Sequence, residues 1–111
     1  EGVASWYGSC FKGRSMASGL LFDPETAVVA SRTLRLGAVV LIENLENGKR
    51  AIASVADRGP YIDGRILDVS YKVARDLGMV ERGLAKVRVW EIRMEDKQRA
   101  EVDQREGGKE R

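Results

Sequence analysis

The chain has 111 residues, 43% of them hydrophobic, and a formal net charge of +2, which predicts one small domain with a single core. It has no histidine and one cysteine, Cys10, so an intrachain disulfide, a cysteine-based zinc site and a histidine-activated thiol are excluded. We therefore expect no metal and no cofactor. The charge pattern lacks the dense basic stripe of nucleic-acid binders, and no apolar stretch is long enough to span a membrane.

The predicted elements begin with a strand over residues 2–7 and a loop over 8–19, which is rich in glycine and serine. Phe22-Asp23-Pro24 predicts a turn, because Asp before Pro favours turn initiation. A short apolar run follows over 27–30. Residues 38–42 are a clear β segment.

The second half predicts a hairpin, two more strands and one helix. Asn47-Gly48 favours a type I′ hairpin turn into a strand over 49–55. Further strands are expected over 65–69 and 84–92. Between them, one short helix near 70–77 is indicated by an N-cap residue, four apolar residues at helical spacing and a C′ glycine: Ser70, Tyr71, Val73, Ala74, Leu77 and Gly78.

The composition changes sharply at Met94. Residues 95–111 are almost entirely charged and polar, so we expect a domain over 1–93 and a charged C-terminal linker or extension over 94–111, partly helical or disordered. A strand-rich domain with one helix and many tight turns predicts a small closed β barrel rather than a βαβ sheet.

The run Val55-Ala56-Asp57-Arg58-Gly59-Pro60-Tyr61 is the most informative for function. It places a carboxylate beside a guanidinium at the end of a strand, before a Gly-Pro corner that restricts the backbone. An acid held on a rigid corner can serve as general acid and base. The alternative is an Asp-Arg pair that only stabilises a turn, and these residues alone favour neither interpretation.

Several motifs in order along residues 2–92 resemble one family, the RlpA-like (rare lipoprotein A) domains. They include Gly2-Val3-Ala4-Ser5-Trp6-Tyr7-Gly8, Ala17-Ser18-Gly19, Arg32-Thr33-Leu34, Asp57-Arg58-Gly59-Pro60-Tyr61 and Asp68-Val69-Ser70. The resemblance implies a six-stranded double-psi β barrel, the fold of expansin and barwin domains. It also implies a protein of the bacterial periplasm or cell envelope that acts on peptidoglycan. An outer-membrane lipoprotein anchor would then lie in a segment outside this sequence.

The resemblance further implies lytic transglycosylase chemistry. Such enzymes cleave the β-1,4 bond between N-acetylmuramic acid and N-acetylglucosamine without water. An acid protonates the leaving oxygen, and its conjugate base then assists attack by the sugar's own 6-hydroxyl, which gives a 1,6-anhydro product. One carboxylate can play both roles in turn, whereas ordinary glycosidases need two. Asp57 matches the family's catalytic aspartate.

The sequence departs from the family pattern at polar positions. Leu20 replaces a Glu after Ala-Ser-Gly, and Ser31 replaces a His before Arg-Thr-Leu. Ser54 and Ala56 stand where Arg and Asn are usual, and Met16 replaces a Thr. Loss of one preorganised polar group commonly lowers a rate by about 10²–10³. We therefore expect the site to be degenerate, with weak or absent cleavage.

Further candidate residues surround the expected cleft. Alternation along the first strand predicts that at most one of Trp6 and Tyr7 faces the cleft, and core packing is the alternative for both. Leu20, Leu21 and Phe22 form either a plug of the core or a protein-binding patch. The candidate substrate-binding residues are Trp6, Tyr7, Arg14, Ser18, Ser31, Arg58 and Tyr61.

Three functions follow from these observations. The first is a peptidoglycan-associated pseudoenzyme that binds glycan strands or an envelope protein partner. The second is an active lytic transglycosylase with Asp57 as its sole general acid and base. The third is a structural part of an envelope assembly, which would use Leu20–Phe22 and the charged tail as contacts and would not touch glycan.

Overall fold

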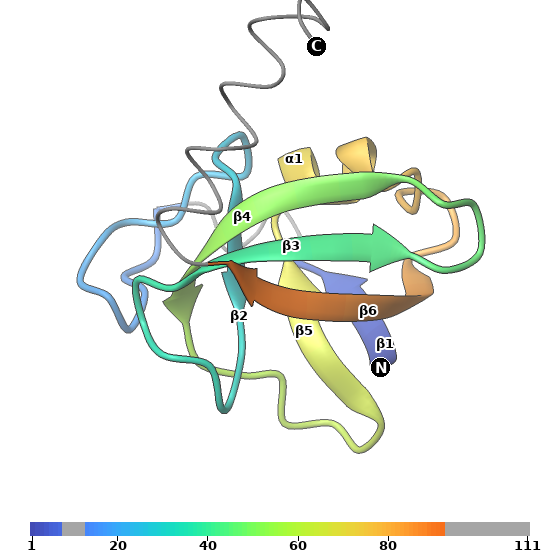
Figure 1. The fold of residues 1–111 in the computed structure, drawn as a ribbon. Helices are drawn as coiled ribbons and strands as arrows, with labels where there is room; N and C mark the ends of the chain where they lie inside the picture. Colours follow the sequence, from blue (N-terminus) through green and yellow to red (C-terminus); the bar gives the residue numbers. More distant parts are fainter. Residues whose placement is uncertain (8–12, 93–111) are drawn as a thin grey trace, which may run out of the picture.

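The computed structural model describes residues 1–7 and 13–92, in which six strands close into a barrel and one helix packs against it (Figure 1). This confirms the predicted barrel with one short helix. Cys10 and the predicted extension over 94–111 lie outside the described residues. The elements are β1 (Gly2–Trp6), β2 (Val28–Ala30), β3 (Val39–Asn44), β4 (Arg50–Asp57), β5 (Arg65–Val69), α1 (Tyr71–Asp76) and β6 (Leu84–Ile92).

The order of strands around the barrel is β1-β5-β2-β4-β3-β6, so most neighbours in the barrel are distant in sequence. The pairs β1–β5 and β2–β4 are parallel, and the other pairs are antiparallel. Only β3 and β4 form a local hairpin among these neighbours. As a consequence, the end of β4, where Asp57 lies, comes beside the residues that follow β2.

The core follows the period-two alternation of the strands. In β3, Val40 and Ile42 are buried while their neighbours are partly exposed, and β6 buries Ala85 and Val87 in the same way. Side chains of alternating residues point to opposite faces, so each strand contributes one face to the barrel interior. Met79 follows α1 and is also fully buried in this cluster.

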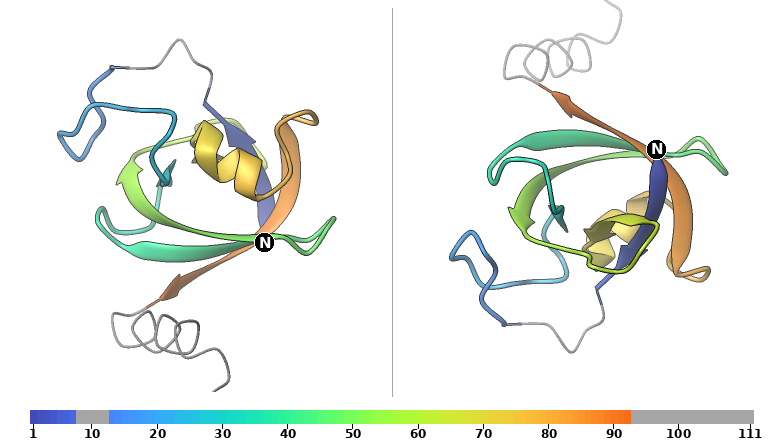
Figure 2. Two further views of the ribbon diagram at one scale, coloured as in Figure 1. Left: turned by 90° about the horizontal axis from the view of Figure 1, so that it is seen from above. Right: turned by 90° about the horizontal axis from the view of Figure 1, so that it is seen from below.

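The helix α1 is six residues long and depends on its packing. Ser70 caps it, because its Oγ accepts a hydrogen bond from the Val73 N–H at 3.3 Å. Gly78 has a positive φ of 68° after the helix, as predicted for a C′ residue. A helix this short is unstable alone. Seen from above, α1 lies within the outline of the barrel, where Val73 and Leu77 join the core (Figure 2).

The β3–β4 hairpin forms where predicted, but its turn is not type I′. A type I′ turn needs positive φ at both central residues, and only Gly48 has one, at 79°. A longer loop closes instead, through bonds from Gly48 N to Asn44 O (2.7 Å) and from Asn44 N to Lys49 O (2.8 Å). The loop is held by α1: the side-chain amides of Asn44 and Asn47 both donate to Leu77 O, at 2.8 and 3.1 Å.

Within residues 1–7 and 13–92, no helix has the length and apolar character needed to cross a membrane. The same part of the chain contains no group of three or more Cys, Asp or Glu side chains arranged to hold a metal ion.

Candidate functional site

Asp57 is the last residue of β4, and its carboxylate is held by backbone groups. Its Oδ1 accepts hydrogen bonds from Ala17 N at 2.9 Å and from Arg58 N at 2.8 Å. The contact to Ala17 joins the carboxylate to the excursion over residues 13–22, which the Ser18 N–H also anchors by donating to Ala56 O at 3.0 Å. Asp57 is half-buried, so it is fixed in direction while still reaching solvent.

Asp57 faces a cleft of about 210 Å³. The described lining combines one acid, two arginines, two hydroxyls and two apolar side chains. Asp57 is the only carboxylate among the described lining residues, so this part of the chain supplies one acid–base group to the cleft. The lining residues are Tyr7, Arg14, Ser15, Met16, Phe22, Asp57 and Arg58.

The guanidinium of Arg58 supports the turn that follows β2. Its Nη1 donates to Ser31 O at 2.9 Å and to Leu34 O. The Ser31 N–H in turn donates to the backbone oxygen of Asp57 at 3.1 Å. Arg58 therefore lines the cleft and also joins the corner after β4 to residues 31–34, which is the stabilising role considered for it from the sequence.

Ser31 is buried, and its hydroxyl caps the same turn. Its Oγ accepts from Thr33 N at 3.2 Å and from Leu34 N at 3.0 Å. It does not belong to the described lining of the Asp57 cleft. A serine at this position therefore provides a turn cap, because a hydroxyl next to free N–H groups accepts from them readily.

Three other predicted site residues lie outside the described cleft lining. Leu20 is 63% exposed at the tip of the excursion, where its backbone oxygen accepts from Met16 N at 2.8 Å. Ser18 is exposed, and its Oγ accepts a long bond of 3.4 Å from Leu20 N. Tyr61 is 74% exposed beyond the Gly-Pro corner.

A small apolar cluster underlies the cleft. Met16, Phe22 and Ala56 are its buried members, and Tyr7 and Val28 pack against it. The rings of Tyr7 and Phe22 lie 4.6 Å apart between centroids and are tilted by 54°. Two positions that depart from the family pattern, Met16 and Ala56, thus pack in one cluster, a long apolar side chain beside a short one.

The proposed surface patch over residues 20–22 needs a correction. Phe22 is buried, so it plugs the cluster beneath the cleft and offers no surface to a partner. Leu20 and Leu21 remain exposed, at 63% and 66%. A run of three apolar residues does not reveal which of them points inward, because the excursion is not a regular strand. Ser54, the remaining departure from the pattern, pairs with Val28 and Val39 inside the sheet.

The Tyr7 hydroxyl is buried near the negative charge of Asp57. Burial raises the pKa of this phenol well above its ordinary value, and the negative charges of Asp57 and Asp68 act in the same direction. Tyr7 therefore keeps its proton at neutral pH. Asp68 itself accepts a hydrogen bond from the Ser5 hydroxyl.

A second hollow, of about 300 Å³, adjoins the first and is lined by Trp6, Tyr7, Pro24 and Tyr71. Tyr7 lines both, whereas Trp6 is absent from the described lining of the Asp57 cleft. Both nevertheless line the second hollow, since β1 ends at Trp6 and alternation stops there.

Sequence reasoning missed Pro24, Tyr71 and Ser15 as lining residues. Tyr71 had a place on the apolar face of the predicted helix, and Pro24 in a predicted turn. No local sequence pattern predicts that Tyr71 lies close to Trp6. The parallel pairing of β1 with β5 brings the two residues together, because α1 follows β5 directly and Trp6 lies opposite Val69.

Comparison with known proteins supports the resemblance. A family model described as lytic transglycolase matches residues 1–89. A probable endolytic peptidoglycan transglycosylase RlpA of Aquifex aeolicus is 47% identical over 84 residues, 76% of this chain and 37% of the relative. The endolytic peptidoglycan transglycosylase RlpA of Vibrio cholerae is 42% identical over 89 residues, 80% of this chain and 34% of the relative. The chain thus spans about a third of these relatives' length.

Solved structures share the fold at low identity. A Streptomyces papain inhibitor superposes with a TM-score of 0.64 at 22% identity, covering 83% of this chain and 92% of the inhibitor. An expansin of Clavibacter michiganensis superposes with a TM-score of 0.65 at 21% identity, covering 84% of this chain and 50% of the expansin. Taken with the closed six-stranded barrel and the family match over 1–89, the chain belongs to the lytic transglycolase family and is an RlpA-like domain with the double-psi β-barrel fold.

Proposed function

We propose that this chain is a peptidoglycan-associated module of the periplasm or cell envelope, which binds glycan strands through the Asp57 cleft and cleaves them weakly or not at all. One observation carries the proposal: Asp57 lines the cleft, whereas Leu20 and Ser31, which stand where the family pattern has Glu and His, lie outside its described lining. The family membership and the names of the curated relatives support peptidoglycan as the ligand. In this proposal residues 1–93 form the binding domain, and residues 94–111 are a charged linker or extension.

The cleft has groups that suit a glycan of this kind. Arg14 is exposed on its lining and can attract the carboxylates of muramic acid and of the peptide stems. Ser15 offers a hydroxyl to sugar oxygens, while the buried side chains of Met16 and Phe22 form the apolar floor of the cleft. Binding needs only this complementarity, whereas cleavage also needs groups that stabilise charge in the transition state.

Residual cleavage is the second candidate function, because the Asp57 carboxylate lines the cleft. In that case Asp57 protonates the glycosidic oxygen as the bond from C1 breaks. Its carboxylate then takes the proton from the 6-hydroxyl as that oxygen bonds to C1, which restores the acid. The Ala17 and Arg58 N–H groups would orient the carboxylate. Neither Leu20 nor Ser31 contributes a side chain to the described lining, so the cleft lacks the Glu and His of the family pattern and the charge developing at C1 is poorly stabilised.

Isolated sacculi test both candidates with one protein preparation. We expect the protein to pellet with sacculi and to release few or no anhydro-muropeptides, as measured by mass spectrometry. Strong release that Asp57→Asn abolishes would establish the enzyme instead. Absence of both pelleting and release would contradict the proposal and favour the structural role through Leu20 and Leu21.

Leu20→Glu tests whether the missing acid explains the weak chemistry. Leu20 is exposed at the tip of the excursion, so a glutamate there should not disturb the fold. Leu21→Glu is the matched control, because Leu21 is next to Leu20, is similarly exposed and undergoes the same change in charge. We expect release of anhydro-muropeptides to rise with Leu20→Glu only. Equal release from both variants would show that position 20 does not limit cleavage. Ser31→His would restore the histidine of the family pattern but would also remove the buried Ser31 cap of the turn, so Leu20→Glu is tested alone.

A further inference from the structure

The hollow lined by Trp6, Tyr7, Pro24 and Tyr71 is distinct from the Asp57 cleft, and Tyr7 lines both. Three of its four described lining residues are aromatic. Its volume of about 300 Å³ is at the lower end of the range for small-molecule sites, about 300–1,000 Å³, which is room for a single sugar residue. The carbon-bound hydrogens on the face of a pyranose ring pack well on an aromatic ring.

The walls of this hollow are fixed by several contacts. Trp6 Nε1 donates to Val80 O at 3.3 Å, and the Trp6 and Tyr71 rings lie 5.5 Å apart at 58°. The two rings therefore form an angled platform. Tyr71 begins α1, so the Ser70 cap also sets its position. Pro24 O accepts a hydrogen bond from Lys72 N at 2.9 Å, which joins the 23–26 turn to the helix.

An ion pair adds to the rim beside Tyr71. Arg75 pairs with Glu25 at 3.1 Å, and its guanidinium carbon lies 5.2 Å from the centre of the Tyr71 ring. The pair links α1 to the segment that carries Pro24. The hollow is thus preorganised, because these contacts hold together the elements that form it before any ligand binds.

We propose that this aromatic hollow is a sugar subsite, in which the amino sugar next to the one held at Asp57 stacks on Trp6 and Tyr71. The inference rests on the proposed function, because it takes the same glycan strand across both sites. Tyr7 is the shared boundary between them. The acetamido methyl of such a sugar suits the apolar lining, and the charged groups of the peptide stems do not.

Stacking on Tyr71 is tested by pelleting with sacculi and by binding to glycan strands stripped of their peptides. Tyr71→Ala should weaken binding about two- to tenfold, the range expected for loss of one aromatic contact. Tyr71→Phe should bind as the wild-type does, because stacking uses the ring and not the hydroxyl. A thermal melt of each variant shows whether the fold is retained.

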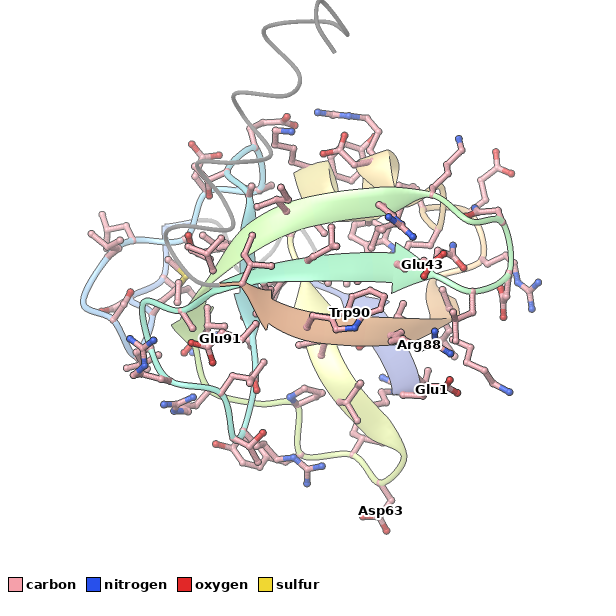
Figure 3. All side chains as sticks on the ribbon, in the orientation of Figure 1. Glu1, Glu43, Asp63, Arg88, Trp90 and Glu91 are labelled. Atoms are coloured by element: carbon pink, nitrogen blue, oxygen red, sulfur yellow. The ribbon has the colours of Figure 1, made fainter. Side chains whose placement is uncertain are left out.

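Trp90 supplies the matched control. It is 38% exposed on β6, with the Arg88 guanidinium 5.9 Å from its ring centre, and it points outward from the barrel (Figure 3). Trp90→Ala should leave binding unchanged. The chain has two tryptophans, so Trp90→Phe makes Trp6 the only one and its fluorescence a direct probe of the hollow. Emission from Trp6 should shift as stripped strands are added.

The outcomes separate this inference from the proposed function. If the wild-type protein does not pellet with sacculi, the proposed function falls and the subsite falls with it. If it pellets while folded Tyr71→Ala binds as tightly as wild type, the proposed function stands and the subsite is overturned. Binding that requires the peptide stems, or a Trp6 emission unchanged at saturation, would also overturn the subsite.

Discussion

At the residue scale, the site depends on how each polar group is used. Asp57 accepts two backbone N–H groups and still lines the cleft, whereas the Ser31 hydroxyl is fully engaged in capping its own turn. Arg58 combines both roles, since it lines the cleft and bonds to two carbonyl oxygens. Whether a polar residue reaches the cleft thus depends on where the fold places it as well as on its type.

Tyr7→Phe should remove a pH-dependent part of stability. Burial and the charge of Asp57 hold the pKa of the folded Tyr7 hydroxyl above its ordinary value of 10.0, which applies in the unfolded chain. The native state therefore keeps a proton that the unfolded state releases, and the free energy of unfolding falls as pH rises above about 10. We expect urea unfolding between about pH 8 and pH 11 to show a shallower fall for Tyr7→Phe than for wild type. Parallel curves for the two proteins would contradict this.

At the scale of the element, α1 is stabilised by its packing against the barrel although it is only six residues long. Its six residues would not form a helix in water, yet Val73, Ala74 and Leu77 are completely buried against the barrel. The Ser70 cap and the Gly78 exit limit it at both ends. The helix in turn carries Tyr71 to the aromatic hollow, so its stability and the geometry of that hollow are linked.

Leu77→Ala should destabilise the protein by about 2–5 kcal/mol, because it leaves a cavity between the end of the helix and the barrel. Ile52→Ala is the control: Ile52 is 45% exposed on β4, so its removal should have a much smaller effect on the free energy of unfolding. Urea denaturation measures both. Similar losses in the two variants would mean that the helix contact contributes no more than the outer surface of the sheet.

At the scale of the molecule, the order of strands around the barrel assembles the site. Tyr7, which directly follows β1, meets residues of the excursion over 13–22 and the end of β4 at the Asp57 cleft. On the same side, the start of α1 joins Trp6 and Pro24. A tertiary clasp supports this arrangement, since Asn44 and Asn47 of the β3–β4 hairpin both donate to Leu77 O.

Asn44→Ala should weaken this clasp and cost about 1–3 kcal/mol, because Asn44 is buried and its removal leaves a carbonyl poorly satisfied. Asn47→Ala removes the longer bond, from a more exposed residue, and should cost less. The comparison needs the midpoint of urea unfolding for both variants. A larger loss in Asn47→Ala would show that the outer amide is the one that holds the helix end.

What the sequence by itself determined has local causes. Alternating residues set the strands, Ser70 and Gly78 set the ends of the helix, and the ordered motifs identified the RlpA-like family and Asp57. Tertiary structure decided the rest. It converted the expected type I′ turn into a longer loop, buried Phe22 and Ser31, and brought Tyr71 to Trp6. The reason is physical: propensity and capping act between neighbours in the chain, whereas the cleft and the hollow arise from pairing between strands far apart in sequence.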